Sequence, residues 1–332
     1  MNKKLAQNRQ NVKPPYCNTG AVNTKGLKSL IDWVSFTLPE SEFHSLSDIY
    51  GFLDIPEKEW VDAKRGNHGY KGQKLCGHIN LFYDGTEGMG FHISISGQGC
   101  RELEQRKGLV WPELFQKIID KGHFTRLDVA IDDHDGHFKI DHLKKKVKKG
   151  ECISKFNKAR GMEEFNLKSG DTDGQTLYFG SPTSRLQIRI YDKAKEQGVA
   201  GTWIRTEIQA RDERADVIAC NILESKNIGI VTLGILKNYI KFAEPISDSN
   251  KSRWPVSKFW IKFLGVVEKV KLTIKKPDKT IRETIEWANK QWAPTAALLI
   301  RYFKGDLSFF DDLISDGEKR LKPRHWALLH NF

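Results

Sequence analysis

The stretch RLQIRIYDKAKEQG, residues 185–198, alternates polar and apolar side chains and then breaks. Arg185, Gln187, Arg189 and Tyr191 share one face of the predicted strand, and the other face is aliphatic. The stretches FTRLDVAIDDHDG (124–136) and TWIRTEIQAR (202–211) alternate in the same way. Strands with one apolar and one polar face are typical of an antiparallel sheet that is buried on one side.

Working outward, further strands are predicted at 30–38, 78–85, 90–99 and 176–180, and the last forms a hairpin with 185–192 through the turn SPTS. Helical periodicity appears in the second half of 100–122, at 140–150, and through most of the chain after residue 211. We therefore expect an α+β protein, in which a large antiparallel β-sheet with helices on one side is followed by a mostly α-helical, basic domain. The predicted segments are a basic flexible arm (1–28), a sheet domain (29–215) and a helical domain (216–332), with a boundary between 215 and 255.

Charge is distributed unevenly along the 332 residues, whose net charge is +12. Residues 1–28 contribute +6, residues 29–250 contribute −2 and residues 251–332 contribute +8. Basic ends around a nearly neutral centre suit a polyanionic partner such as DNA. Five scattered cysteines, no 18-residue apolar run and no signal-like N-terminus predict a reduced cytoplasmic protein without a membrane span.

Carboxylates and a tyrosine lie on the polar faces of the three alternating strands. Asp128 and Asp132 come from one strand, Tyr191 from the next and Glu207 from the third. If these strands are neighbours, the acids form a cluster of hard oxygen ligands that suits Mg²⁺ or Mn²⁺. A phenol has a pKa near 10, so a nucleophilic Tyr191 needs such a cation, or Lys193 beside it, for attack on a phosphodiester.

Two structural interpretations of the same residues stay open at this point. In the first interpretation, Tyr191 is an ordinary sheet tyrosine. In the second, Asp128 forms a structural ion pair with Arg126, and Glu207 forms one with Arg205. The lysine-rich face of 140–150 is similarly read as a solvated face, with phosphate contact as the alternative. The candidate DNA contacts are Arg126, Arg189, Arg205, Lys144, Lys145 and Lys148.

Four ordered blocks resemble the signature blocks of the replication initiation factor family: SGQGCRELE (96–104), RLDVAIDD (126–133), TLYFGSPTSRLQIRIYDKAKEQG (176–198) and WIRTEIQAR (203–211). That family comprises rolling-circle initiators of plasmids and filamentous phages and related relaxases of integrative elements. The resemblance implies that Tyr191 nicks one strand at the double-strand origin, leaving a 5′-phosphotyrosine and a free 3′-OH. It also implies that Asp128 and Glu207 bind the metal; Asp132 corresponds more weakly, and His92 or Asp32 more weakly still.

The resemblance thus implies an origin-specific, metal-dependent nicking and joining enzyme that uses Mg²⁺ or Mn²⁺. Its expected partners are origin DNA, a host helicase and polymerase, and a second copy of the chain. The paired-histidine metal site of a related superfamily is not expected, because His134 and His137 are too far apart for a His-hydrophobic-His triplet. Tyr178 is a possible second tyrosine on the neighbouring strand.

Two other functions stay open. A non-catalytic, sequence-specific DNA-binding regulator is compatible with the charge distribution alone. A tyrosine recombinase is disfavoured, because its tyrosine is expected in a C-terminal helix rather than on a strand in the middle of the chain.

Overall fold

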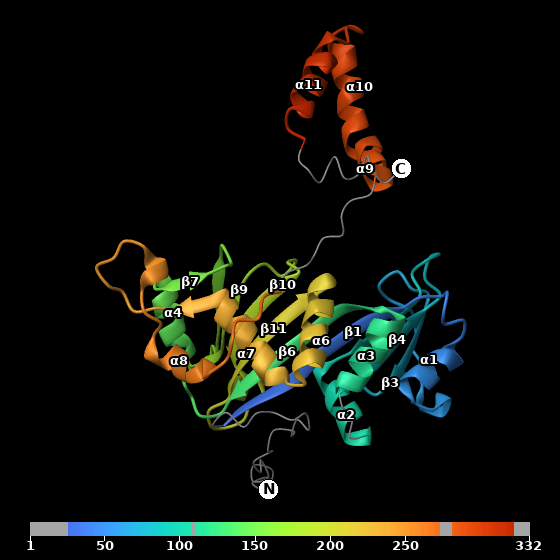
Figure 1. Ribbon diagram of the computed structural model, residues 1–332. Coiled ribbons are helices and arrows are strands. Elements are labelled where there is room, and N and C mark those ends of the chain that lie inside the picture. The colour runs from blue at the N-terminus through green and yellow to red at the C-terminus, as the bar shows by residue number, and fades with distance from the viewer. Residues whose placement is uncertain (1–25, 108–110, 273–280, 322–332) are drawn as a thin grey trace. The chain divides into compact units, whose positions relative to one another are not determined.

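The computed structural model describes residues 26–107, 111–272 and 281–321 (Figure 1). Two compact units divide the chain, one up to Thr273 and one from Ile274. The division lies later than the predicted boundary at 215–255, because the helices of 213–264 pack with the sheet and belong to the first unit. The predicted basic arm lies outside the described residues except for 26–28, and Leu27 and Lys28 already belong to the first strand.

A ten-stranded antiparallel sheet forms the first unit, in the order β2-β3-β4-β5-β1-β6-β11-β10-β9-β8. This confirms the predicted α+β class with a large antiparallel sheet. The strands are β1 (Leu27–Leu38), β2 (Val61–Asp62), β3 (Gly72–Cys76), β4 (Ile79–Tyr83), β5 (Phe91–Ile95), β6 (His123–Asp133), β8 (Ala159–Phe165), β9 (Thr172–Phe179), β10 (Leu186–Asp192) and β11 (Ile204–Arg211). A separate ribbon pairs β7 (Cys152–Ser154) with β12 (Ile240–Phe242).

Helices lie between and after the strands. In the first unit they are α1 (Leu46–Leu53), α2 (Gly97–Lys107), α3 (Trp111–Lys121), α4 (Ile140–Lys148), α5 (Lys193–Glu196), α6 (Glu213–Ser225), α7 (Ile228–Tyr239) and α8 (Lys258–Leu264), with short 3₁₀ turns at Glu57–Glu59 and Lys251–Arg253. The described part of the second unit contains α9 (Ile281–Trp287), a π-helical turn (Ala288–Trp292), α10 (Ala293–Tyr302) and α11 (Ser308–Glu318).

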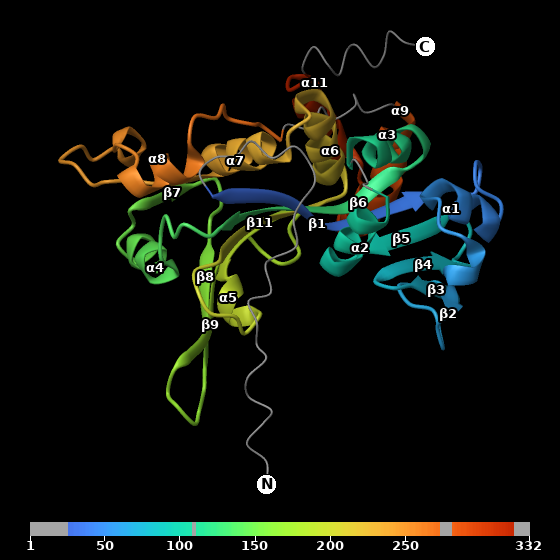
Figure 2. The ribbon, with the colours of Figure 1, turned by 90° about the horizontal axis from the view of Figure 1, so that it is seen from below.

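The hydrophobic core lies between the aliphatic face of the central strands and the helices α3, α6 and α7, which cover that face (Figure 2). Ile131, Ile190 and Ile208 are fully buried there, as their alternation predicts. On α6 the buried side chains recur at helical spacing, from Ala215 to Ile222. The opposite face of the same strands carries the polar residues, and it is flanked by the start of α2 and by α5.

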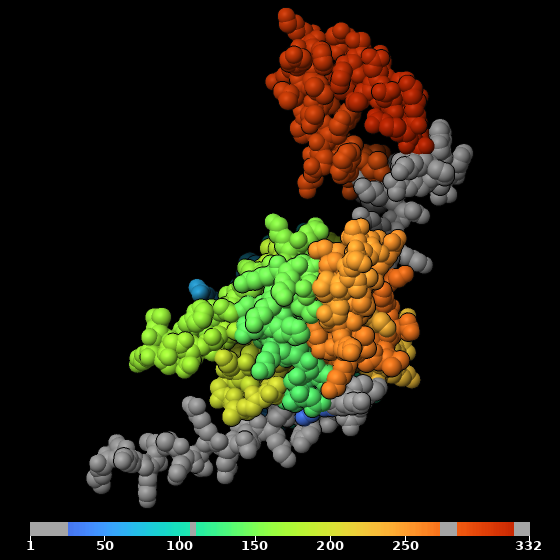
Figure 3. Space-filling view, turned by 90° about the vertical axis from the view of Figure 1, so that its left-hand side faces the viewer, coloured from blue at the N-terminus to red at the C-terminus, as the bar shows by residue number. Residues whose placement is uncertain are grey.

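A hairpin formed by β8 and β9 projects from the first unit (Figures 2 and 3). Every residue of β8 is exposed, and the strand has no apolar alternation that could have revealed it in the sequence. Its partner β9 pairs on its other side with β10, where Thr176 is opposite Tyr191. The hairpin therefore springs directly from the strand that carries the candidate tyrosine.

Helix α4 corrects one expectation about the lysine run. Lys146 is buried rather than solvated: its ammonium group contacts Glu151 at 3.0 Å, Glu244 at 3.1 Å and the carbonyl of Ala243 at 2.9 Å. Helix α4 packs against the rest of the first unit through Ile140 and Leu143, and Lys146 is buried beside them. A buried ammonium group needs polar or charged partners.

Candidate active site

Strand register brings the predicted site residues onto one face of the sheet. In one row, Tyr191 of β10 is opposite Arg205 of β11, which is opposite Asp132 of β6. In the next row on this face, Arg189 is opposite Glu207, which is opposite an alanine. Alternate residues of paired antiparallel strands share a face, so the rows stack into one polar surface.

A β-bulge in β1 adds two consecutive residues to this surface. The pairing of β1 with β6 shifts between Ile31 and Trp33, which leaves Asp32 as the extra residue. Asp32 then contacts Arg205 while Trp33 stacks on Arg126, so both side chains point to the polar face.

Arg205 holds two of the acids. Its Nε and Nη2 donate to the two carboxylate oxygens of Asp132 at 2.7 and 2.8 Å, and its Nη1 donates to Asp32 at 2.8 Å. Arg205 is only 6% exposed. Burial opposes ionisation of Asp32, but the combined attraction of Arg205 and the neighbouring cations Lys193, Arg101 and Arg189 outweighs it and lowers the Asp32 pKa. Arg205 is therefore a structural clamp within the site.

A second arginine holds Asp128. Arg126 Nε lies 2.9 and 3.1 Å from the two oxygens of Asp128, and Nη2 lies 2.5 Å from one of them. The Arg126 guanidinium also covers the Trp33 ring at 4.3 Å. Burial raises the pKa of Asp128 even though Arg126 acts in the opposite direction. The ion-pair interpretation was thus correct for Arg126 with Asp128.

For Glu207 the ion-pair interpretation named the wrong partner. Arg205 faces Asp132 across the strands, and Glu207 is instead paired with Arg189, whose Nη2 lies 2.7 Å from Oε1. Glu207 is fully buried, and burial together with the charges of Asp128 and Asp32 raises its pKa to about 8. The Arg189 contact lacks hydrogen-bond geometry, so Oε1 is a buried oxygen without a hydrogen-bond partner.

Tyr191 donates its hydroxyl to the other oxygen of Glu207, at 3.2 Å. The side chain is 5% exposed, and burial, followed by the Glu207 charge, raises its pKa. The guanidinium of Arg189 and the ammonium of Lys193 lie over the ring, 5.1 and 5.6 Å from its centre. Tyr191 is thus within direct reach of one predicted acid, on the predicted face, in a sheltered conformation.

Two cavities adjoin this cluster. The larger has a volume of about 660 Å³ and is lined by six basic and three acidic side chains, together with Trp33 and Trp203. The basic residues are Lys28, Arg101, Arg126, Arg189, Lys193 and Arg205, and the acids are Asp32, Asp128 and Asp132. The smaller, of about 250 Å³, is lined by Tyr191 and Tyr178 and lies beside the β8–β9 hairpin. A cavity with excess positive charge and aromatic walls suits a nucleotide.

The predicted metal ligands are held by arginines. Among the described residues, no group of three or more His, Cys, Asp or Glu side chains is arranged to hold a metal ion. Asp132 has both oxygens on Arg205, and Asp128 has both on Arg126. Glu207 Oε1, which has the Arg189 ion pair but no hydrogen bond, and the mutual repulsion among Asp32, Asp128 and Glu207 nevertheless make this the place where a cation would be favourable.

The lysines predicted to contact DNA lie elsewhere. Lys144 pairs with Glu163 of β8 and Asp141 of its own helix, whereas Lys145 and Lys148 are exposed. Helix α4 is tied to Glu163 and Gln175, which are on the face opposite Thr176 and Tyr191. The structure therefore does not bring these lysines to the tyrosine.

The weaker candidate His92, and His137, which was not expected to bind metal, lie apart from the site. His92 contacts Thr37 Oγ1 at 3.1 Å and packs beside the rings of Tyr70 and Phe82. His137 is buried, and its Nδ1 lies 2.9 Å from Asp133 Oδ1. Both histidines therefore have structural partners away from Tyr191.

Three lining residues were not assigned from sequence. Arg101 was inside a quoted block but received no role; it donates to the carbonyl of Ile31 at 2.6 Å and to Glu104 at 2.9 Å. Trp33 and Trp203 lie in predicted strands, but the sequence analysis gave neither of them a functional role. The signal that could have identified Trp203 is its alternation with Arg205 and Glu207 on one strand face.

Comparisons with known proteins identify the family of the chain. Residues 122–316 match the family described as "Replication initiation factor", and residues 28–117 match "Rolling Circle replication initiation protein N-terminal domain". The chain is 30% identical over 341 residues to "Putative DNA relaxase NicK" of Bacillus subtilis (strain 168), covering 95% of each chain. A solved structure of a rolling circle replication initiator protein from Geobacillus stearothermophilus superposes with a TM-score of 0.70 at 38% identity, covering 75% of this chain and 100% of that one.

Proposed function

This chain belongs to the replication initiation factor family, and on that basis we propose that it nicks and rejoins one DNA strand at the origin of a rolling-circle replicon. The observation that carries the proposal is the hydrogen bond between Tyr191 and Glu207 beside a cavity with six basic side chains. A phosphodiester entering that cavity would meet Arg189 and Lys193, the two cations that already lie over the tyrosine ring.

In the proposed reaction, the Tyr191 oxygen attacks the scissile phosphorus. The new bond joins that oxygen to phosphorus, the bond from phosphorus to the 3′ oxygen breaks, and the product is a 5′-phosphotyrosine with a free 3′-OH. Glu207 accepts the phenolic proton, since it already accepts that hydrogen bond and a pKa of about 8 lies close to physiological pH. The proton gained by the leaving 3′ oxygen balances the one lost by the phenol. Rejoining is the reverse reaction.

Arginines around the cavity would bind and orient the strand. Arg101, Arg126 and Arg189 line its wall, and guanidinium groups bind phosphate oxygens through paired donors. Arg205 has its three donor nitrogens committed to Asp132 and Asp32, so we assign it to holding the site together. Because Tyr191 is buried, DNA binding must bring its oxygen into line with the scissile phosphorus while the Glu207 contact is kept.

We further propose that the reaction depends on Mg²⁺ or Mn²⁺. Glu207 Oε1 and Asp128 are the residues that would hold the ion, after Arg126 releases Asp128; Asp132 is the weaker candidate because Arg205 occupies both its oxygens. A bound divalent ion would supply charge neutralisation on the non-bridging phosphate oxygens.

The direct test uses a supercoiled plasmid that carries the cognate origin. The wild-type chain should produce open circles and a covalent protein–DNA adduct on Tyr191, identified by mass spectrometry. Tyr191→Phe should bind the origin without nicking it, and Tyr178→Phe is the matched control because both tyrosines line the smaller cavity. Nicking by Tyr191→Phe at the wild-type rate would show that the nucleophile is another group.

Metal dependence is tested by calorimetric titration of Mn²⁺ into the full-length chain. Asp128→Asn and Glu207→Gln should each weaken Mn²⁺ binding, whereas Asp120→Asn, on the exposed side of α3, should not. Equal Mn²⁺ affinity in all four proteins would place the ion elsewhere, whatever the effect of these substitutions on nicking.

The alternative function is a non-catalytic DNA-binding regulator, and the sheltered position of Tyr191 is the observation that favours it. Origin binding without an adduct, at any divalent ion concentration, would support this alternative. If the chain is the enzyme, we propose that it acts in the bacterial cytoplasm on phage or plasmid DNA. We also propose that it acts as a homodimer, and that a host helicase and polymerase use the nicked product. No helix in the described ranges is long and apolar enough to span a bilayer.

A further inference from the structure

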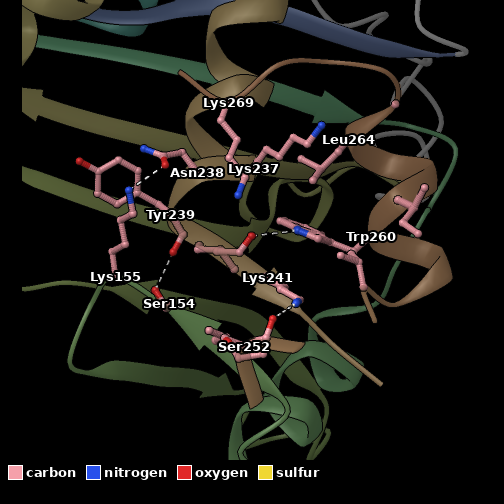
Figure 4. Close-up of a pocket in the computed structure, with 15 residues that line it drawn as sticks. Ser154, Lys155, Lys237, Asn238, Tyr239, Lys241, Ser252, Trp260, Leu264 and Lys269 are labelled. Carbon is pink, nitrogen blue, oxygen red and sulfur yellow. Dashed lines mark hydrogen bonds between the residues drawn. The ribbon is translucent and has the colours of Figure 1, made fainter. Parts of the chain in front are cut away.

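A separate cavity of about 480 Å³ lies at the C-terminal end of α7, between the β7–β12 ribbon and α8 (Figure 4). Four lysines line it: Lys155, Lys237, Lys241 and Lys269. They come from three separate parts of the chain, around residues 155, 237–241 and 269, so the fold, and not a single local run of charge, gathers them. Figure 4 shows their side chains around one hollow whose side wall carries Trp260 and Leu264.

The charges of these lysines are not neutralised within the described chain. Three ammonium groups donate to neutral oxygens: Lys155 to Asn238 at 2.7 Å, Lys237 to the Val267 carbonyl at 2.5 Å and Lys241 to the Ser252 carbonyl at 2.9 Å. Lys269 has no partner in the residues that the structure describes, and none of the four forms an ion pair there. Each ammonium has three donors, so the cavity retains both charge and hydrogen-bonding capacity for an anion.

The aromatic side chains of the cavity are already engaged. Trp260 is fully buried and donates its indole N–H to the Ile240 carbonyl at 3.1 Å. The ring of Tyr239 is covered by the Lys155 ammonium at 5.3 Å, and its hydroxyl accepts from Arg214. A nucleobase would find no free ring to stack on, so phosphate recognition is the chemistry that remains.

This cavity is distinct from the one beside Tyr191. Helix α7 packs on the aliphatic face of the sheet, where Gly229 lies against the side chain of Ser29. Ser29 is opposite Ile131 on β6, whereas Asp132, the next residue, points to the face of the candidate active site. A strand bound by the four lysines therefore cannot be the segment held at the tyrosine.

We propose that this four-lysine cavity binds phosphodiester groups of DNA outside the nicked segment, without regard to base sequence. The surrounding stretch, residues 237–271, carries eight Lys or Arg against three Asp or Glu, a net charge of +5 that extends the attraction beyond the cavity. The proposal requires that the protein bind DNA, as its proposed function states, but does not depend on Tyr191 or on nicking.

The test compares two double variants of the full-length chain. Lys155→Gln/Lys269→Gln removes two exposed cavity lysines, and Lys258→Gln/Lys262→Gln removes two exposed lysines of α8 that do not line it. Fluorescence anisotropy with a labelled origin duplex is measured over a range of salt concentrations. Counterion release gives a slope of about 0.9 per phosphate contact, so the cavity variant should lower the slope by about 2 and weaken binding at 0.15 M salt by roughly 30-fold.

The control variant should change both quantities far less, and thermal unfolding should show both variants folded. Wild-type salt dependence in the cavity variant, or an equal loss in the control, would overturn the proposal. Titration with deoxythymidine monophosphate distinguishes a site for free nucleotides from a site for the DNA backbone. The proposal also fails if the wild-type cavity binds the free nucleotide while the cavity variant binds duplex DNA with wild-type affinity. Nicking of a short single-stranded origin oligonucleotide should stay at the wild-type rate in the cavity variant, so this failure is distinguishable from that of the tyrosine mechanism.

Discussion

Replacing Arg205 tests how the site is held together. Arg205→Met should destabilise the first unit by about 3–5 kcal/mol, the usual cost of removing one partner of a buried ion pair. The structure supports the full cost, because Arg205 is 6% exposed and makes three charged hydrogen bonds of 2.7–2.8 Å to Asp132 and Asp32. Its loss would leave Asp132 buried and charged with no other ion pair among the described residues.

A double-mutant cycle separates this cost from loss of packing. Asp132→Leu alone leaves Arg205 with only Asp32. Arg205→Met/Asp132→Leu removes both charges of the Arg205–Asp132 pair and leaves only the partly exposed Asp32 without Arg205, so it should cost much less than the sum of the two single changes. We expect a coupling energy of at least about 2 kcal/mol. Arg205→Lys keeps the charge but not the paired donors, so its cost should be intermediate.

The assay is urea unfolding of the full-length chain, followed by tryptophan fluorescence. Trp111 and Trp260 are fully buried in the first unit and report its unfolding. A loss below about 1 kcal/mol for Arg205→Met, in the range of solvated surface pairs, would refute the clamp. Additive single-site costs would refute it equally, because independent side chains show no coupling.

Three further outcomes are expected for the first unit. Burial lowers the pKa of His92 from 6.5 to about 4, so this histidine is protonated in the unfolded chain before it is protonated in the folded one as the pH falls. The free energy of unfolding should therefore decrease between about pH 6.5 and 4, by up to roughly 3 kcal/mol. Urea unfolding at about pH 7 and 4.5 should show that His92→Gln removes most of this decrease. Asp212 has φ 49° and ψ −134°, a backbone conformation that strains any residue other than glycine. Asp212→Gly should therefore raise the free energy of unfolding by about 1 kcal/mol, and a lower melting temperature would contradict this. Lys146→Met should cost about 1–3 kcal/mol by leaving its acidic partners unpaired, against a near-zero effect of the exposed control Lys145→Met; equal melting temperatures would show that Lys146 is solvated.

Strand alternation made much of the site predictable. A strand has a period of two, so the aliphatic positions of β6, β10 and β11 fix which side chains face away from the core. Tyr191, Glu207 and Asp132 could therefore be assigned from the sequence to the polar faces of their strands. The block around Tyr191 then identified the family, which the comparisons confirm.

Pairing across strands could not be predicted in the same way. Neighbours on one strand made Arg205 and Glu207 the obvious pair, but the register puts Arg205 beside Asp132 and Arg189 beside Glu207. The place of Asp32 depends on an extra residue in β1, for which strand periodicity gives no signal. Burial of Lys146 depends on how α4 packs with segments about 100 residues away.

The extra residue of β1 also decides which genetic changes the protein can tolerate. Ile31 and Trp33 pair with the consecutive residues Val129 and Asp128, so losing the Asp32 codon would leave β1 in regular register with β6, and both halves of the strand would keep their faces. Arg205 would lose one of the two acids that it holds. Loss of Asp32 should therefore spare the core and change only the polar surface of the sheet.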